Sequence, residues 1–89
     1  MIKLIWDEGF KRSYKKKAKN NEEWKNNFWK SLKLFSDNPF NPSLKTHKLT
    51  GKLRGFWAYS CGYDCRIVFK FIKDDEILLI DIGTHDEVY

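Results

Sequence analysis

Apolar side chains alternate with a period of two at the start of the chain and in its second half, and they recur with a helical period in between. Residues 1–6 alternate and predict a short strand. Helices are predicted over residues 8–19 and 20–37, with Asp7 and Asn21 as their N-caps. The apolar positions of the two helices are Phe10, Tyr14, Ala18, Trp24, Phe28, Leu32 and Phe35.

Two Asn-Pro pairs within residues 38–42 end the second helix, because the residue before a proline avoids the helical region. Strands are predicted over residues 44–49, 55–61, 65–71 and 77–83, the first of them the weakest, with tight turns at 62–64 and 73–76. This order predicts an α+β fold, in which an N-terminal strand and two helices pack on a small, mainly antiparallel sheet. The length predicts a single domain over residues 1–89.

Alternation along the last two strands predicts which side chains face the helices. The entirely apolar sets are assigned to the core: Ile67, Phe69 and Phe71 in one strand, and Leu78, Ile80 and Ile82 in the other. Arg66, Lys70 and Asp81 are then expected on the open face of the sheet, where they meet a ligand or solvent.

A net charge of +5 indicates an anionic partner, most simply a nucleic acid, although a solvated basic surface explains it equally well. No run of apolar residues is long enough to cross a bilayer, and no signal-peptide pattern opens the chain. We therefore expect a cytoplasmic protein without membrane contact. The two cysteines are expected to be thiols, because small secreted scaffolds carry more than one bridge.

Residues 44–55 form a basic segment, since no acid occurs between Asp37 and Asp64. Clustered cations attract phosphates and release counterions, and nearby aromatic rings stack on bases. The alternative is an edge strand that lysines protect from pairing with other chains. The cations are Lys45, His47, Lys48, Lys52 and Arg54, and the aromatic residues that follow are Phe56, Trp57 and Tyr59.

A second set of polar residues lies at strand ends, at a turn and at the end of the chain. Its members are His47, Asp64, Arg66, His85 and Tyr89. RNA cleavage without a metal needs a base, a cation at the phosphate and an acid for the leaving oxygen, and these residue types can fill those roles. Taken singly, each also has an ordinary explanation as a surface residue or a turn former.

Cys61, Cys65, His47 and His85 are all residue types that bind zinc, but their spacing matches no compact zinc motif. Cys61 and Cys65 flank a three-residue turn, so a disulfide between them is conceivable in an oxidising setting only. Phosphate-loop, dinucleotide-binding and zinc-protease motifs are absent. We expect neither a metal nor a cofactor.

Three segments in order resemble toxins of the RelE/ParE superfamily from bacterial type II toxin–antitoxin systems, and most of all their RelE and YafQ branches. The segments are "NPSLKTHKLTGKLRGFW", "GYDCRIVFKF" and the closing "GTHDEVY". The resemblance covers nearly the whole chain. It implies a RelE-like fold, metal-independent cleavage of mRNA on the ribosome, and a cognate antitoxin as partner.

The resemblance also implies roles for single residues. His47, Asp64 and His85 match catalytic residues of the YafQ branch, Arg66 matches a phosphate-contacting arginine of the RelE branch, and Tyr89 matches the terminal aromatic residue of both. Lys45, Lys48, Lys52, Arg54 and Lys70 are the expected RNA-binding cations.

The chain departs from the family pattern at a few positions. Ser60 replaces a histidine and Asp81 an arginine of the YafQ branch, and Trp57 and Tyr59 stand where the RelE branch has lysines. Two alternative functions therefore stay open. One is a ParE-like toxin that poisons DNA gyrase, and the other is a module that binds RNA or an antitoxin with weakened catalysis.

Overall fold

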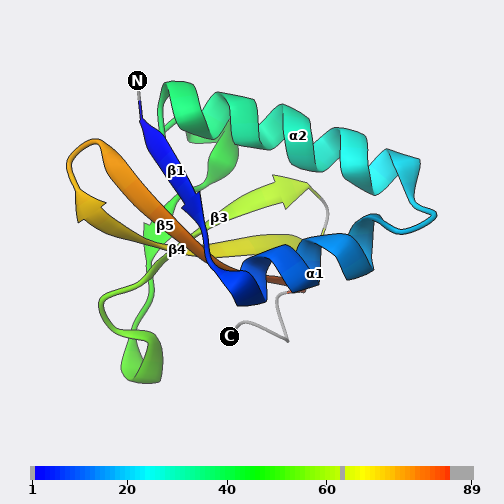
Figure 1. The fold of residues 1–89 in the computed structure, drawn as a ribbon. Coiled ribbons are helices and arrows are strands. Elements are labelled where there is room, and N and C mark those ends of the chain that lie inside the picture. Colours follow the sequence, from blue (N-terminus) through cyan, green and yellow to red (C-terminus); the bar gives the residue numbers. More distant parts are fainter. Residues whose placement is uncertain (1, 63, 85–89) are drawn as a thin grey trace.

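The computed structural model describes residues 2–62 and 64–84, and Figure 1 shows the order of their elements. A short strand precedes two helices, and the remaining strands follow, as the sequence predicts. The elements are β1 (Lys3–Trp6), α1 (Glu8–Ala18), α2 (Glu22–Asp37), η1 (Pro42–Leu44), β2 (His47–Lys48), η2 (Gly51–Leu53), β3 (Trp57–Gly62), β4 (Cys65–Lys73) and β5 (Glu76–Gly83), where η marks a 3-10 turn.

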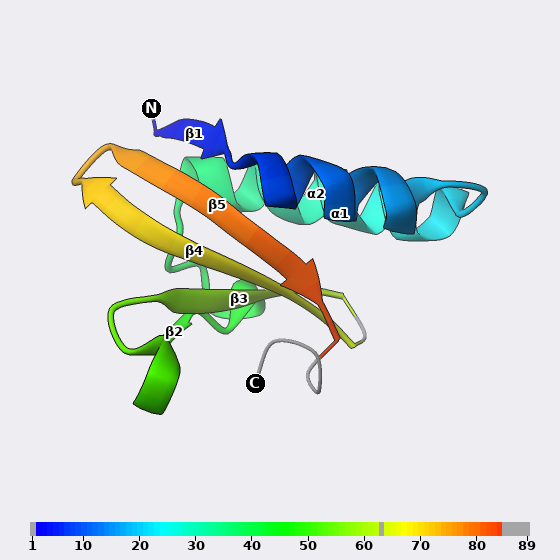
Figure 2. The same cartoon turned by 60° about the horizontal axis from the view of Figure 1, so that its bottom comes forward.

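The strands form one five-stranded sheet in the order β1-β5-β4-β3-β2. Every neighbouring pair is antiparallel except β1 and β5, which run parallel. Both helices lie on the same side of the sheet, as Figures 1 and 2 show. The predicted α+β architecture is confirmed.

Both helices begin where the sequence places their caps. The Asp7 carboxylate accepts a hydrogen bond from the Gly9 amide at 2.9 Å, and the Asn21 side chain accepts one from the Trp24 amide at 3.0 Å. Each cap satisfies a backbone N–H that the first helical turn leaves without an intrahelical partner. The caps therefore fix where each helix starts relative to the sheet.

Aromatic side chains fill the space between the helices and the sheet. Phe35 of α2 stacks on Tyr59 of β3, with ring centroids 4.5 Å apart, and meets Phe69 of β4 edge-on at 4.8 Å. All three rings are fully buried, and Phe10 and Phe28 extend the same core. Burying one such side chain stabilises a fold by roughly 1.5–3 kcal/mol.

The predicted faces of β5 are partly wrong. Ile77 and Leu79, expected on the open face, are fully buried in the core, whereas Leu78 and Ile80 are only partly buried. The cause is a bulge: Val68 pairs with Asp81 and Phe69 with Leu79, so Ile80 is an extra residue in β5. Simple alternation fails there, although Ile82 is buried and Asp81 exposed as expected.

The predicted strand over 44–49 shortens to the two residues of β2, which pair with Trp57 and Ala58. Lys45 takes a left-handed conformation (φ 54°) after η1 and ends regular pairing before β2. Beyond β2, residues 50–56 fold over the open face of the sheet (Figure 2). Leu53 and Phe56 pack there on a second small core that contains Leu49, Ala58 and Val68.

Within the described residues, neither helix is long and apolar enough to cross a bilayer.

A matched pair of leucines tests the bulge. Leu79→Ala should cost about 2–5 kcal/mol of unfolding free energy, because it opens a cavity in the main core. Leu78→Ala should cost clearly less, since its side chain is only partly removed from water. Urea unfolding of both variants measures the difference, and equal losses would contradict the bulged register.

Candidate functional site

A polar cleft lies at the end of the β3–β4 hairpin. Lys45, Ser60, Gly62, Asp64 and Arg66 line this cleft, which has a volume of about 380 Å³. Ser60 and Arg66 are direct partners in the β3–β4 ladder, so their side chains leave the sheet on the same face. Lys45 reaches the cleft from the other side, just after η1. Two segments distant in sequence thus bring cations to one place.

Arg66 is held by two hydrogen bonds from its Nη1. One goes to the Ser60 hydroxyl at 3.3 Å and the other to the Cys65 carbonyl at 3.1 Å. Ser60 in turn donates to the Gly62 carbonyl at 3.1 Å. A guanidinium has five N–H donors, and the contacts of Arg66 with the described residues use Nη1 alone. Its Nε and Nη2 can therefore be directed toward a bound anion.

Asp64 places a carboxylate in the same cleft. It takes a left-handed conformation (φ 50°), which aspartate tolerates better than most residues, and it is exposed. The turn former expected from the sequence and the expected site residue are therefore the same side chain. Both the shape of the turn and the charge of the cleft depend on it.

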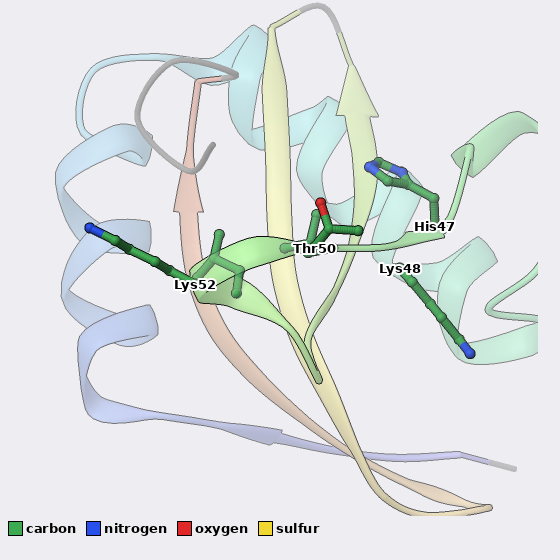
Figure 3. A pocket seen from close by; sticks show the side chains of 6 residues that line it. His47, Lys48, Thr50 and Lys52 are labelled. Atoms are coloured by element: carbon green, nitrogen blue, oxygen red, sulfur yellow. The ribbon is translucent and has the colours of Figure 1, made fainter.

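His47 lies beside the cleft, in a second cavity of about 430 Å³ that Figure 3 shows. Its Nδ1 donates to the Lys45 carbonyl at 2.9 Å, because a carbonyl oxygen only accepts. In the neutral ring the basic lone pair is then on Nε2, which suits proton transfer. Leu49, Thr50 and Lys52 share this cavity.

The expected RNA-binding cations do not all gather here. Lys48 points away from His47 (Figure 3), and its Nζ lies 5.5 Å from the centre of the Trp57 ring. Lys48 and Lys52 nevertheless line the His47 cavity, and Lys48 also lines a neighbouring cavity of about 570 Å³ with Arg54. Lys70 is exposed on β4, four residues and therefore roughly 13 Å along the strand from Arg66.

The aromatic residues expected to stack on bases are mostly committed to packing. Tyr59 is fully buried on Phe35, so it is not available to RNA. Burial raises the pKa of the Tyr59 phenol, and a weak contact of 3.5 Å with the Ser31 hydroxyl only partly offsets it. Trp57 packs against Phe40 and Phe71, and Phe56 belongs to the second core.

The expectation that both cysteines are thiols is wrong in this structure: Cys61 and Cys65 form a disulfide. Their Cα atoms lie 5.2 Å apart, which is within the usual range for a bridge. The β3–β4 pairing is irregular between Ser60 and Gly62, and this lets Cys61 and Cys65 both enter the main core. Among residues 2–62 and 64–84, no cluster of His, Cys, Asp and Glu could hold a metal.

A comparison with protein families decides the affiliation. The family described as the bacterial toxin of a type II toxin–antitoxin system, YafQ, matches residues 2–89. The chain belongs to the YafQ family.

Solved toxin structures share this YafQ-family fold. A copper-bound mutant toxin from Helicobacter pylori is 28% identical over 100% of both chains, with a TM-score of 0.73. YafQ from E. coli strain BL21(DE3) is 18% identical over 100% of this chain and 99% of its own, with a TM-score of 0.80. A YoeB–YefM complex from Staphylococcus aureus is 20% identical over 96% and 98%, with a TM-score of 0.74. Among curated proteins none matches.

The structure places each residue that departs from the pattern of the YafQ or the RelE branch. Ser60 supports Arg66, as described above. Asp81 accepts a hydrogen bond from the Ser13 hydroxyl of α1 at 3.3 Å and one from the Ile82 amide at 2.9 Å. Trp57 and Tyr59 belong to the helix-covered face, so they do not replace cations on the open face. His85 and Tyr89 of this YafQ-family chain lie outside the described residues.

Sequence reasoning missed the part that Gly62 plays in the cleft and the support that Ser60 gives to Arg66. Both follow from the hairpin register, which could have been counted outward from the predicted turn at 62–64. Lys45 was expected only as one cation of a basic segment, and η1 sets it apart from Lys48 and Arg54.

Burial of Tyr59 predicts a pH dependence. Its folded-state pKa is raised, so the unfolded chain loses the phenolic proton first as the pH rises above about 10. The contribution of Tyr59 to the free energy of unfolding is therefore complete below that pH. Above it the contribution falls, by up to about 1.4 kcal/mol per pH unit.

Tyr59→Phe removes the titrating group and keeps the ring. Unfolding free energies of the native chain and this variant should run parallel up to about pH 10 and diverge above it, with the variant losing less. Urea titrations at several alkaline pH values measure both. Parallel curves throughout would show that Tyr59 does not carry the effect.

Proposed function

We propose that this YafQ-family toxin is a metal-independent endoribonuclease that cuts mRNA on the ribosome. The observation that carries the proposal is the cleft at the hairpin end, in which Arg66 and Lys45 lie beside Asp64. Two cations in one polar cleft suit a phosphodiester, and the supported guanidinium of Arg66 can bind it with two parallel hydrogen bonds.

Each proton transfer can be given to a residue of this chain. His47 is the candidate base: its Nε2 would take the proton from the 2′-hydroxyl, which then attacks the phosphorus. Arg66 and Lys45 would stabilise the charge that builds on the phosphate oxygens. His85 is the candidate acid for the leaving 5′-oxygen, and Tyr89 would position it. Asp64 would orient a histidine or the arginine.

The remaining cations would guide the RNA toward the cleft. Lys52 lines the His47 cavity, Arg54 lines the adjoining one and Lys48 lines both, so a strand lying over β2 and η2 would meet all three. Lys70 extends the positive surface along β4. Such contacts supply affinity that falls with added salt and carries little base specificity.

A cognate antitoxin is the proposed protein partner, and the cytoplasm is the proposed site of action. The Staphylococcus aureus relative was solved as a toxin–antitoxin complex, YoeB–YefM. For this chain, the net charge of +5 and the basic segment favour an antitoxin segment that is acidic and orders on binding. It would cover the cleft, so that the complex is inactive.

A second candidate function is an RNA-binding or antitoxin-binding module with weak catalysis. It is favoured by Ser60 and Asp81, which stand where the YafQ branch has a histidine and an arginine. Asp81 is an acid that accepts a hydrogen bond from Ser13, so the positive charge of that arginine is not replaced at this position.

Toeprinting of translating ribosomes, run beside an assay for gyrase-linked DNA breaks, distinguishes the candidates. The endoribonuclease should cut within the A-site codon. His85→Ala should abolish cutting, because one acid or base contributes roughly 10²–10⁴ in rate. The antitoxin complex should not cut either, because the antitoxin would cover the cleft. DNA breaks without RNA cleavage would identify a gyrase poison. If neither activity is found, the binding module is the remaining candidate.

A separate prediction concerns Arg66. Arg66→Ala should slow single-turnover cleavage by about 10²–10³, as loss of a donor that stabilises transition-state charge does. Arg66→Lys should restore only part of the rate, because a point charge cannot replace a planar fork.

Lys70→Ala is the matched control for Arg66, since it removes a cation from the same strand outside the cleft. It should leave the cleavage rate of bound RNA unchanged. It should weaken RNA binding and lower the salt dependence of that binding by about one charge. Similar effects of Arg66→Ala and Lys70→Ala on both quantities would assign Arg66 to docking.

A further inference from the structure

The disulfide lies within the segment that builds the cleft. Cys61 and Cys65 are the only two cysteines of the chain and are separated by four positions. Of the described residues that line the cleft, Gly62 and Asp64 lie inside the bridged segment, and Ser60 and Arg66 flank it directly. Lys45 comes from elsewhere in the chain.

The polar contacts that orient Arg66 depend on the same segment. One acceptor of the guanidinium is the carbonyl of Cys65 itself, and the other is the hydroxyl of Ser60, next to Cys61. Ser60 is tied to the Gly62 carbonyl inside the bridged segment. The position of Arg66 is therefore fixed by groups that the bridge holds together.

The backbone of the bridged segment takes conformations that need support. Gly62 has a φ of 139° and Asp64 a φ of 50°, both outside the regions that most residues prefer. The covalent link between Cys61 and Cys65 holds the two ends of this turn close together. Without that link the turn has more conformations available, and the pairing of Ser60 with Arg66 is one of the contacts it can lose.

Cys61 also lines a third cavity of about 230 Å³, between α2 and the end of β3, which shares Ser60 and Gly62 with the cleft. A reagent would approach the bridge through this cavity. Asn27, Ser31 and Leu34 of α2 form its other wall. Both cysteines are almost completely buried, so exchange needs a small opening of this cavity.

We propose that Cys61 and Cys65 form a thiol–disulfide exchange site that switches the anion-binding cleft between an organised oxidised form and a relaxed reduced form. The reductant is a dithiol. One of its thiolates attacks a sulfur of the bridge and forms a mixed disulfide while the other cysteine leaves as a thiolate and takes up a proton. The second thiol of the reductant then releases the mixed disulfide, so two electrons reduce the bridge and the dithiol becomes a disulfide.

This switch rests on the proposed function for its biological meaning, because the cleft is the proposed RNA site. In a reducing compartment the bridge opens, and protein disulfides that do form there are usually transient, catalytic or redox-sensing. Oxidation would then increase the activity of the toxin by fixing the position of Arg66. Because the loop closed by the bridge is short, its loss should leave the fold intact.

The first measurement follows the redox state and the cleft without RNA. The purified chain is equilibrated in dithiothreitol buffers of graded ratio, and alkylation with mass spectrometry counts the thiols. NMR of the Arg66 Nε–H and the Gly62 amide reports the cleft in each state. Their signals should shift together with the thiol count, whereas signals of α1 should stay in place and far-ultraviolet circular dichroism should be unchanged.

The second measurement uses a 2′-O-methyl oligoribonucleotide, which cannot be cleaved. The oxidised chain should bind it about tenfold or more tightly than the reduced chain, the factor expected for one ordered charge-assisted hydrogen bond. Cys61→Ser/Cys65→Ser and Cys61→Ala/Cys65→Ala chains should resemble the reduced form and ignore the reductant. Two different replacements guard against a folding defect of one of them.

Two results would overturn the switch: full alkylation of both cysteines even after treatment with an oxidant, or identical NMR signals of Arg66 and Gly62 in both states. If those signals shift but neither form binds the oligonucleotide, the switch stands and the proposed RNA site fails. If both forms bind RNA equally with shifted signals, Arg66 does not hold the phosphate and the functional part of the switch is overturned.

Discussion

The stack of Tyr59 on Phe35 determines the orientation of the whole hairpin. Because Tyr59 is committed to the helix-covered side, Ser60 must point to the open face, where it pairs with Arg66. A slip of one residue would bury Ser60 and expose the tyrosine, with loss of the ring contacts that Tyr59 makes in the core. Hydrophobic packing on one face of the sheet thus decides which polar groups are available on the other.

The sequence was sufficient for the elements whose signals are local. Asp7 and Asn21 mark helix starts, and the Asn-Pro pairs mark the end of α2, because capping and proline sterics act within a few residues. It was insufficient where a single residue changes register. The bulge at Ile80 follows from how β5 fits β4 and reaches α1, which no local period contains.

The candidate site divides in the same way. His47, Asp64 and Arg66 could be singled out by residue type and by family resemblance, and the fold brings Asp64 and Arg66 into one cleft with Lys45. The side chains of His47 and Lys48 point apart because they leave opposite sides of a two-residue strand, and the Cys61–Cys65 bond depends on redox chemistry as well as distance. Neither is visible in composition. His85 and Tyr89 are known from the sequence alone.

The parallel pairing of β1 with β5 has a consequence for how the molecule forms. Lys3 pairs with Glu76 and Trp6 with Leu79, so the first and last described strands meet across almost the whole chain. Closing such a long loop has a large entropic cost, so this contact is expected to form late in folding. During synthesis it cannot form until β5 has left the ribosomal tunnel. The helices and the β3–β4 hairpin can assemble from local contacts first. Completion of the sheet is therefore a late event in folding, whereas the cleft at the end of the β3–β4 hairpin does not require β1.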